Sequence, residues 1–302
     1  MQLPADFRPA DFLAFHGRDT RQVAERVTGS RIEKGVLWHG HPACLTLDLA
    51  PGHADVQLDV DGPAPEPFDV DTLARHLLGI DQPVAALAAA HRDHPQLGPL
   101  LARLPGLRVP QAATPFEALS WAITGQQISL AAAVSIRRRL IETTNEAAGT
   151  RHSSGLACYP DAATLARLDE PRLRAAGYST TKAATLLHVA RRTADGHLPL
   201  DHWLHARTPA AEIHATLAQL RGIGPWTIDY TLLRGFAQMD GSLHGDVAVR
   251  RKLQALLGPR HPAHPQGSPS LARPVRPLAR AGRGAAVGKL KGASLSPGRR
   301  SG

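Results

Sequence analysis

Apolar and polar positions follow two different periods along the chain. In the first part, three runs alternate imperfectly between apolar and polar side chains and are separated by Gly, Pro and His turns: residues 31–38, 43–49 and 55–60. Such runs are typical of strands in an antiparallel meander. Helical periodicity precedes them at residues 19–27 and follows them at residues 70–78. We therefore expect a small antiparallel-sheet α/β domain over residues 1–82.

From about residue 83 onward the periodicity is helical. Thr114-Pro115 combines an N-cap residue with proline at the first helical position, and Glu117 completes a capping box. Thr208-Pro209 repeats the Thr-Pro start. Further helices are expected at residues 129–146, 161–168 and 180–194. The pattern predicts an all-helical domain over residues 83–260, and hence an α+β fold class for the chain.

The C-terminal residues 261–302 differ in composition from the rest. They contain six Arg, two Lys, six Pro and seven Gly, with no acidic and no aromatic residue. Such a segment buries too little apolar area to offset its ordering entropy, so we expect a disordered tail. Three interpretations stay open for it: a solvated basic tail, a nonspecific DNA-binding arm, or the product of a reading-frame shift in a GC-rich gene.

Charge and composition narrow the class of protein. The net charge is +9, but the tail contributes +8 and the other residues are balanced, with 27 basic and 26 acidic side chains. No apolar stretch approaches the roughly 18 residues needed to span a bilayer, and the N-terminus lacks the features of a signal peptide. We expect a cytoplasmic protein. Sixteen histidines occur without a Cys or carboxylate set around them, so we predict surface histidines and no metal site.

The most informative motif is LRGIGPWT at residues 220–227. An apolar-striped helix ends at Leu220, and Pro225 begins the next helix. Gly222 and Gly224 permit positive φ, and their amides at a helix N-terminus suit a phosphate. A tight turn between two helices with no ligand fits the spacing equally well.

The helix after this motif carries aromatic residues on one face. Trp226, Tyr230 and Leu233 are spaced as i, i+4 and i+7. Such a face is most often part of a core, although two aromatics beside a phosphate-binding turn could also stack on a base. Asp246 precedes another helical run and is by position an N-cap. An ionised carboxylate there also suits the stabilisation of an oxocarbenium sugar.

Taken together, the motifs resemble the helix–hairpin–helix (HhH-GPD) DNA glycosylase superfamily, and most closely its DNA-3-methyladenine glycosylase II (AlkA-like) branch. The hairpin is followed by Asp246, and further matches occur in the family's order. These are FLAF at 12–15, PGLRVP at 105–110, FEA at 116–118, ITGQQIS at 123–129 and YTLLRG at 230–235. The resemblance covers about residues 7–258 and implies the AlkA N-terminal-like and HhH-GPD glycosylase domains.

The resemblance implies a role for each matching residue. Asp246 matches the catalytic aspartate, and Gln127 the side chain that wedges into the gap left by a flipped nucleotide. The remaining matches are with the aromatic walls of the base pocket and with the hairpin positions that hold the DNA backbone. The walls are Phe15, Trp226 and Tyr230, and the hairpin positions are Gly222, Gly224 and Thr227. Relatives often carry a monovalent cation on hairpin carbonyls, and we expect no required cofactor.

One position determines the expected reaction. Bifunctional relatives carry a Lys in the hairpin that forms a Schiff base with the sugar, and Trp226 occupies the matching position here. The resemblance therefore implies a monofunctional DNA glycosylase acting in base excision repair. It would flip alkylated purines of the 3-methyladenine type out of double-stranded DNA and hydrolyse the N-glycosidic bond. The cationic bases would be attracted to the Trp and Tyr faces. We expect a monomer in the bacterial cytoplasm, associated with the nucleoid.

One departure from the family leaves an alternative. The family continues with further helices and a Trp-rich segment, whereas this chain has no Trp after Trp226 and no aromatic after Phe236. We expect reduced stability or activity on this account. The alternative function is a noncatalytic or degenerate helix–hairpin–helix DNA-binding protein with an incomplete C-terminus.

Overall fold

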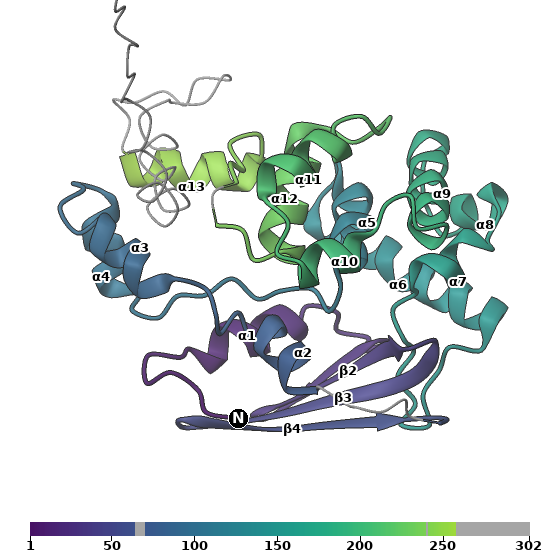
Figure 1. Cartoon of the computed structure of the whole chain (residues 1–302), viewed down its shortest axis with the longest axis horizontal. Coiled ribbons are helices and arrows are strands. Elements are labelled where there is room, and N and C mark those ends of the chain that lie inside the picture. The colour runs from purple at the N-terminus through teal and green to yellow at the C-terminus, as the bar shows by residue number, and fades with distance from the viewer. Residues whose placement is uncertain (64–69, 240, 258–302) are drawn as a thin grey trace, which may run out of the picture.

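A four-stranded antiparallel sheet forms the N-terminal part of the computed structural model, which describes residues 1–63, 70–239 and 241–257 (Figure 1). The strand order follows the sequence, and neighbouring strands pair antiparallel throughout. The strands are β1 (Glu25–Thr28), β2 (Arg31–Trp38), β3 (His41–Ala50) and β4 (His53–Val60). The three predicted runs are confirmed as β2, β3 and β4.

Two short helices, α1 (Pro9–His16) and α2 (Val70–Leu77), cover one face of the sheet (Figure 1). Apolar side chains from the strands and both helices form a common core that includes Phe12, Ile32 and Leu45. The prediction of a helix at residues 19–27 is wrong, because the structure has turns there that lead into a strand. The Asp19 carboxylate accepts hydrogen bonds from the Arg21 amide and the Arg138 guanidinium, which fixes a turn, and β1 begins at Glu25.

The residues after the sheet form helices, as the periodicity predicted (Figure 1). The first of these are α3 (Val84–Ala90), α4 (Leu97–Arg103), α5 (Pro115–Gly125), α6 (Leu130–Ala148), α7 (Ala162–Ala166) and α8 (Glu170–Ala175). They are followed by α9 (Thr180–Ala194), α10 (Leu200–His205), α11 (Ala210–Leu217), α12 (Pro225–Gly235) and α13 (Val247–Leu257). The α+β fold class is confirmed. The exact domain boundaries stay predictions, and the tail at 261–302 lies outside the described residues.

Local signals explain several helix starts. The Thr114 hydroxyl accepts a hydrogen bond from the Glu117 amide at 3.0 Å, as an N-cap should. The Glu117 carboxylate reaches back one residue further than in a capping box and accepts from the Ala113 amide. The second Thr-Pro start is shifted by one residue. Pro209 is itself the N-cap of α11 and forms no side-chain cap.

A buried cluster of charged side chains ties the sheet to the helices. The Lys34 ammonium of β2 donates to Glu25 at 2.7 Å and to Glu117 at 2.9 Å. The Arg137 guanidinium of α6 lies 3.0 Å from Glu117 and 3.5 Å from Glu25. These two cations hold the pKa of both carboxyls below the usual range despite burial. Arg137 is the first of three consecutive arginines and is buried, because these two carboxylates compensate its charge.

Candidate active site

All eight residues predicted for the site line one open cleft of about 1320 Å³. The cleft lies among α1, the loop between α5 and α6, the hairpin between α11 and α12, and the start of α13. The residues are Phe15, Gln127, Gly222, Gly224, Trp226, Thr227, Tyr230 and Asp246. Segments more than 200 positions apart in the sequence therefore contribute to one surface.

The hairpin needs glycine at the first of its two glycine positions. Gly222 has φ +86°, and a Cβ at this position would lie 2.2 Å from the Thr185 hydroxyl oxygen. Gly224 is different, because its φ is −96° and no atom lies within 4 Å of an added Cβ. Gly224 is the N-cap of α12 and has no side chain to cap it. No side chain of Gly224 therefore accepts hydrogen bonds from the first amides of α12. Helix amides without a capping side chain are suited to binding an anion.

Gln126 connects the hairpin to the end of α5. Its side-chain amide donates to the Gly222 carbonyl and to the Thr227 hydroxyl, both at 2.9 Å. Thr227 is buried, so its hydroxyl lies on the inner side of the hairpin, where it accepts this hydrogen bond from Gln126. Only the Gln127 position was predicted from this loop, and Gln126 was missed.

The Asp246 carboxylate lies between α13 and the aromatic face of α12. One oxygen, Oδ1, accepts from the Ala248 amide at 2.8 Å and the Val249 amide at 3.1 Å. The expected N-cap is therefore confirmed. The other oxygen, Oδ2, accepts from the indole Nε1 of Trp226 at 3.3 Å. The carboxylate is thus fixed by three donors in the cleft wall.

Trp226 and Tyr230 form one continuous aromatic surface in the cleft. Their ring centroids are 5.4 Å apart, with an angle of 37° between the rings. Both residues project from α12 and are only partly buried. This surface offers a flat, polarisable wall for a planar ligand next to the Asp246 carboxylate.

The loop that carries Gln127 is held in an unusual conformation. Gln127 has φ +57° and is exposed. The Lys182 ammonium of α9 donates to the Thr124 carbonyl at 2.9 Å and to the Gln126 carbonyl at 2.6 Å. Partial burial lowers the pKa of Lys182. The sequence predicted the helix at residues 180–194 but no site residue on it, so the role of Lys182 in supporting this loop was missed.

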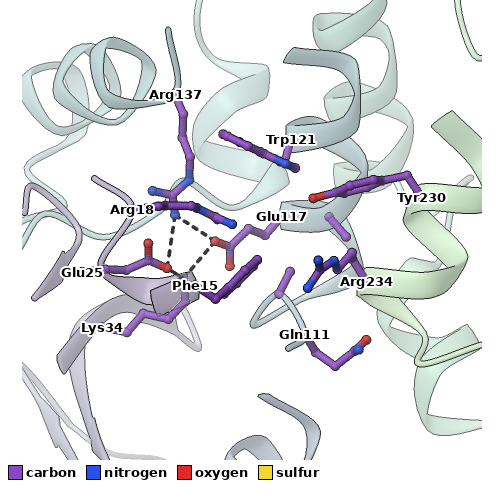
Figure 2. Close-up of a pocket in the computed structure, with 12 residues that line it drawn as sticks. Phe15, Arg18, Glu25, Lys34, Gln111, Glu117, Trp121, Arg137, Tyr230 and Arg234 are labelled. Atoms are coloured by element: carbon purple, nitrogen blue, oxygen red, sulfur yellow. Dashed lines mark hydrogen bonds and ion pairs between the residues drawn. The ribbon is translucent and has the colours of Figure 1, made fainter. Parts of the chain in front are cut away.

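Two arginines and a tryptophan at the inner end of the cleft were also missed. Figure 2 shows Arg18, Trp121 and Arg234 around the Phe15 ring. The guanidinium carbons of Arg18 and Arg234 lie 3.9 and 4.8 Å from the Phe15 centroid, and that of Arg18 lies 4.7 Å from Trp121. A signal for Arg234 existed, because it follows Tyr230 by four residues and therefore shares its helix face.

Two further observations concern metal binding and membrane-spanning helices. Within residues 1–63, 70–239 and 241–257, no three His, Cys, Asp or Glu side chains gather in a group able to hold a metal ion. In the same residues, no helix is both long and apolar enough to cross a membrane.

Comparison with known proteins points to one family. The family model described as "HhH-GPD superfamily base excision DNA repair protein" matches residues 120–276. DNA-3-methyladenine glycosylase 2 of Escherichia coli is 30% identical over 62% of this chain and 70% of its own length. DNA-3-methyladenine glycosylase of Bacillus subtilis is 33% identical over 43% of this chain, which spans only 42% of that relative.

The fold comparison agrees with the sequence comparison. The structure of a 3-methyladenine DNA glycosylase from Archaeoglobus fulgidus superposes with a TM-score of 0.70 over 93% of this chain and 91% of that one, at 19% identity. The family model, the Escherichia coli relative and this fold all point to the resemblance seen in the motifs. The chain therefore belongs to the HhH-GPD superfamily of base excision DNA repair proteins.

Proposed function

We propose that this chain is a monofunctional DNA glycosylase of the 3-methyladenine type that hydrolyses the N-glycosidic bond of alkylated purines in base excision repair. The observation that carries the proposal is the placement of the Asp246 carboxylate beside the Trp226 and Tyr230 rings in a cleft that also includes the hairpin. The names of the Escherichia coli and Bacillus subtilis relatives support this substrate class. They do not support the noncatalytic alternative.

The proposed reaction begins with the DNA backbone on the hairpin. The amides at the start of α12 hold a phosphate, and Gln127 fills the gap from which the damaged nucleotide is extruded, at a cost of a few kcal/mol. The cleft of about 1320 Å³ has room for a nucleotide. The extruded base stacks on Trp226 and Tyr230, with Phe15 at the inner end.

Bond cleavage follows from the charge of Asp246. As the C1′–N bond breaks, its electron pair passes to the base and positive charge develops on the sugar. The ionised carboxylate stabilises that charge electrostatically. Water adds to C1′, its proton passes to solvent, and an abasic site remains. The indole at Trp226 has no amine, so no Schiff base forms with the sugar.

The product distinguishes this reaction from lyase chemistry. We expect intact strands bearing an abasic site, which break only after alkali treatment, and no covalent adduct after borohydride reduction. Gel electrophoresis of an end-labelled duplex before and after alkali measures strand breakage. The same gel after borohydride treatment shows whether a protein–DNA adduct has formed. Strand cleavage without alkali, or a trapped adduct, would contradict the proposed hydrolysis.

The main test is the substitution Asp246→Asn. Asparagine caps a helix as well as aspartate does, so the fold of α13 is retained while the charge is lost. Removing one preorganised electrostatic group costs about 10²–10³-fold in rate, and we expect a loss of this size in release of methylated purines from methylated duplex DNA. DNA binding measured by fluorescence anisotropy should persist. Equal release by both proteins would remove Asp246 from the mechanism.

Partners and cofactors belong to the same proposal. We expect a monomer in the bacterial cytoplasm, associated with the nucleoid, that acts on double-stranded DNA without a required cofactor. A monovalent cation is compatible with the hairpin, since carbonyl oxygens are its usual ligands. Among the described residues, the Gly222 carbonyl accepts one hydrogen bond from Gln126 and the Leu220 carbonyl accepts one from the Ile223 amide, so each oxygen keeps a second lone pair. Substituting tetramethylammonium for potassium should weaken DNA binding without abolishing base release.

A further inference from the structure

Helix α9 contacts two parts of the cleft that come from different stretches of the chain. The Lys182 ammonium, near the start of α9, donates to the Thr124 and Gln126 carbonyls at 2.9 and 2.6 Å. One turn further along, the Thr185 hydroxyl lies 3.5 Å from the Arg221 carbonyl of the hairpin. Residues three apart share a helix face. One face of α9 therefore supports both the loop between α5 and α6 and the hairpin.

The backbone at Gln127 needs such support. Gln127 is exposed in the cleft and has φ +57°, a left-handed conformation that a residue with a side chain keeps only where its surroundings hold it. On its C-terminal side, Ser129 caps α6 and accepts from the Ala132 amide at 3.2 Å. On its N-terminal side, Lys182 binds the Gln126 carbonyl. The strained residue thus lies between two fixed ends.

The Lys182 ammonium also completes the end of α5. The last carbonyls of a helix lack donors within the helix and form the negative end of its dipole, so a cation there is stabilising. Thr124 belongs to the last turn of α5, and Gln126 is the C-cap residue. Residues 115–124 are all buried and α5 packs against α12, which makes α5 a firm base for the loop.

The hairpin holds the same loop from the other side. The side-chain amide of Gln126 donates to the Gly222 carbonyl and to the Thr227 hydroxyl, whereas its backbone carbonyl accepts from Lys182. Thr185 occupies the space that a Cβ at position 222 would need. The loop and the hairpin are therefore fixed relative to each other by Gln126 and by one face of α9.

We propose that Lys182 is a positioning residue for base release, because its ammonium holds the loop between α5 and α6 in the conformation that presents Gln127 to the DNA. This inference rests on the proposed glycosylase function and adds to it a residue that acts through Gln127. Without the ammonium, Gln127 fills the gap in the DNA less often and the extruded state is populated less. The hairpin still holds the backbone, so the rate of release falls while DNA binding persists.

The first test is a double-mutant cycle. Lys182→Met keeps the length of the side chain and the backbone amide that Ser179 caps, but loses the charge and the donors. Single-turnover release of methylated purines from methylated duplex DNA should fall about 10–100-fold, since misplacing a positioned group by about 1 Å can cost 10²-fold. In a Gln127→Ala background the same substitution should cost little, because no wedge remains to be positioned. Arg192→Met removes an exposed charge from α9 and should leave the rate unchanged.

The second test needs no base release. A duplex that contains a tetrahydrofuran abasic analogue next to 2-aminopurine becomes more fluorescent when a side chain enters the gap and unstacks the probe. The wild-type protein should raise the fluorescence, and Lys182→Met should raise it much less, although fluorescence anisotropy gives similar dissociation constants for both. A purely structural role would lower the melting temperature but leave the fluorescence of the folded, DNA-bound protein unchanged. If Lys182→Met does not fold, Lys182→Gln takes its place with the same expected result.

The outcomes separate this inference from the function on which it rests. If the wild-type protein releases no methylated purine while it binds DNA, the proposed function fails, and the fluorescence comparison still tests Lys182. If Lys182→Met raises the fluorescence as much as the wild type does, the positioning role is overturned and the glycosylase stands. The same holds if the losses caused by Lys182→Met and Gln127→Ala multiply in the double variant.

Discussion

At the scale of single residues, the carboxylate of Asp246 has two separate tasks. Its Oδ1 holds the start of α13, and its Oδ2 accepts from Trp226. The capping role was visible in the sequence because Asp stood before a helical run. The indole contact was not, because it depends on how α12 and α13 are placed relative to each other.

The indole contact leads to a prediction for Trp226→Phe. Phenylalanine keeps an aromatic ring for the proposed stacking on the base, whereas the donor to the carboxylate at 3.3 Å is lost. A hydrogen bond to a charged group contributes about 1.5 kcal/mol or more, which corresponds to roughly tenfold or more in rate. Single-turnover base release measures the loss.

Trp203→Phe is the matched control, since Trp203 packs against the helical core and does not line the cleft. Its rate should equal that of the wild type. An unchanged rate in Trp226→Phe would show that the other donors hold the carboxylate well enough without the indole.

At the scale of elements, local sequence predicted most of the helices but not their partners. Thr114, Ser129, Asp161 and Ser179 cap helices whose starts the pattern placed within a residue or two. Arg234 bonds to a carbonyl 124 positions away, and Lys182 to one 58 positions away. Such contacts have no periodicity, so the inner end of the cleft and the support of the Gln127 loop could not be predicted.

The two hairpin glycines give a matched pair of substitutions. Gly222→Ser forces a side chain onto the Thr185 hydroxyl at φ +86°, and strain of this kind costs about 1–3 kcal/mol. Gly224→Ser meets open space at φ −96° and adds a cap to α12. We expect a lower melting temperature only for Gly222→Ser, measured by differential scanning calorimetry. Equal melting temperatures would show that the hairpin relaxes around the added side chain.

At the scale of the whole molecule, buried ionisable groups link the sheet to the helices. Besides the Glu25, Lys34, Glu117 and Arg137 cluster, burial lowers the pKa of His76 to about 4. The charged groups near His76 are Asp81 of its own segment and His205 of α10. Residues on both sides of the predicted boundary at residue 82 thus surround one imidazole.

This imidazole makes stability depend on pH. In the unfolded chain His76 has its ordinary pKa of about 6.5. Below that pH the unfolded state therefore binds a proton that the folded state does not bind until the pH approaches 4. The free energy of unfolding should fall by roughly 1.4 kcal/mol per pH unit between about pH 6.5 and pH 4 and stay constant above that window. Burial lowers the pKa of His16 in the same direction.

Urea unfolding at pH 7 and pH 5.5 checks this expectation. His76→Gln should lose less stability between the two pH values than the wild type. His188→Gln, an exposed position on α9, should lose as much as the wild type. Equal losses in all three proteins would mean that His76 takes up its proton in the folded state.

The capping of α13 by Asp246 also bears on how the protein is made. A ribosome releases Phe15, the α5–α6 loop and the hairpin well before Asp246 and the α13 amides that hold its carboxylate. A growing chain can therefore fold its sheet and most of its cleft while it still lacks the group that the proposed chemistry needs. Synthesis itself keeps the proposed activity low until nearly all of the cleft has been translated, so an unfinished chain that meets the chromosome should create abasic sites far more slowly than the finished protein.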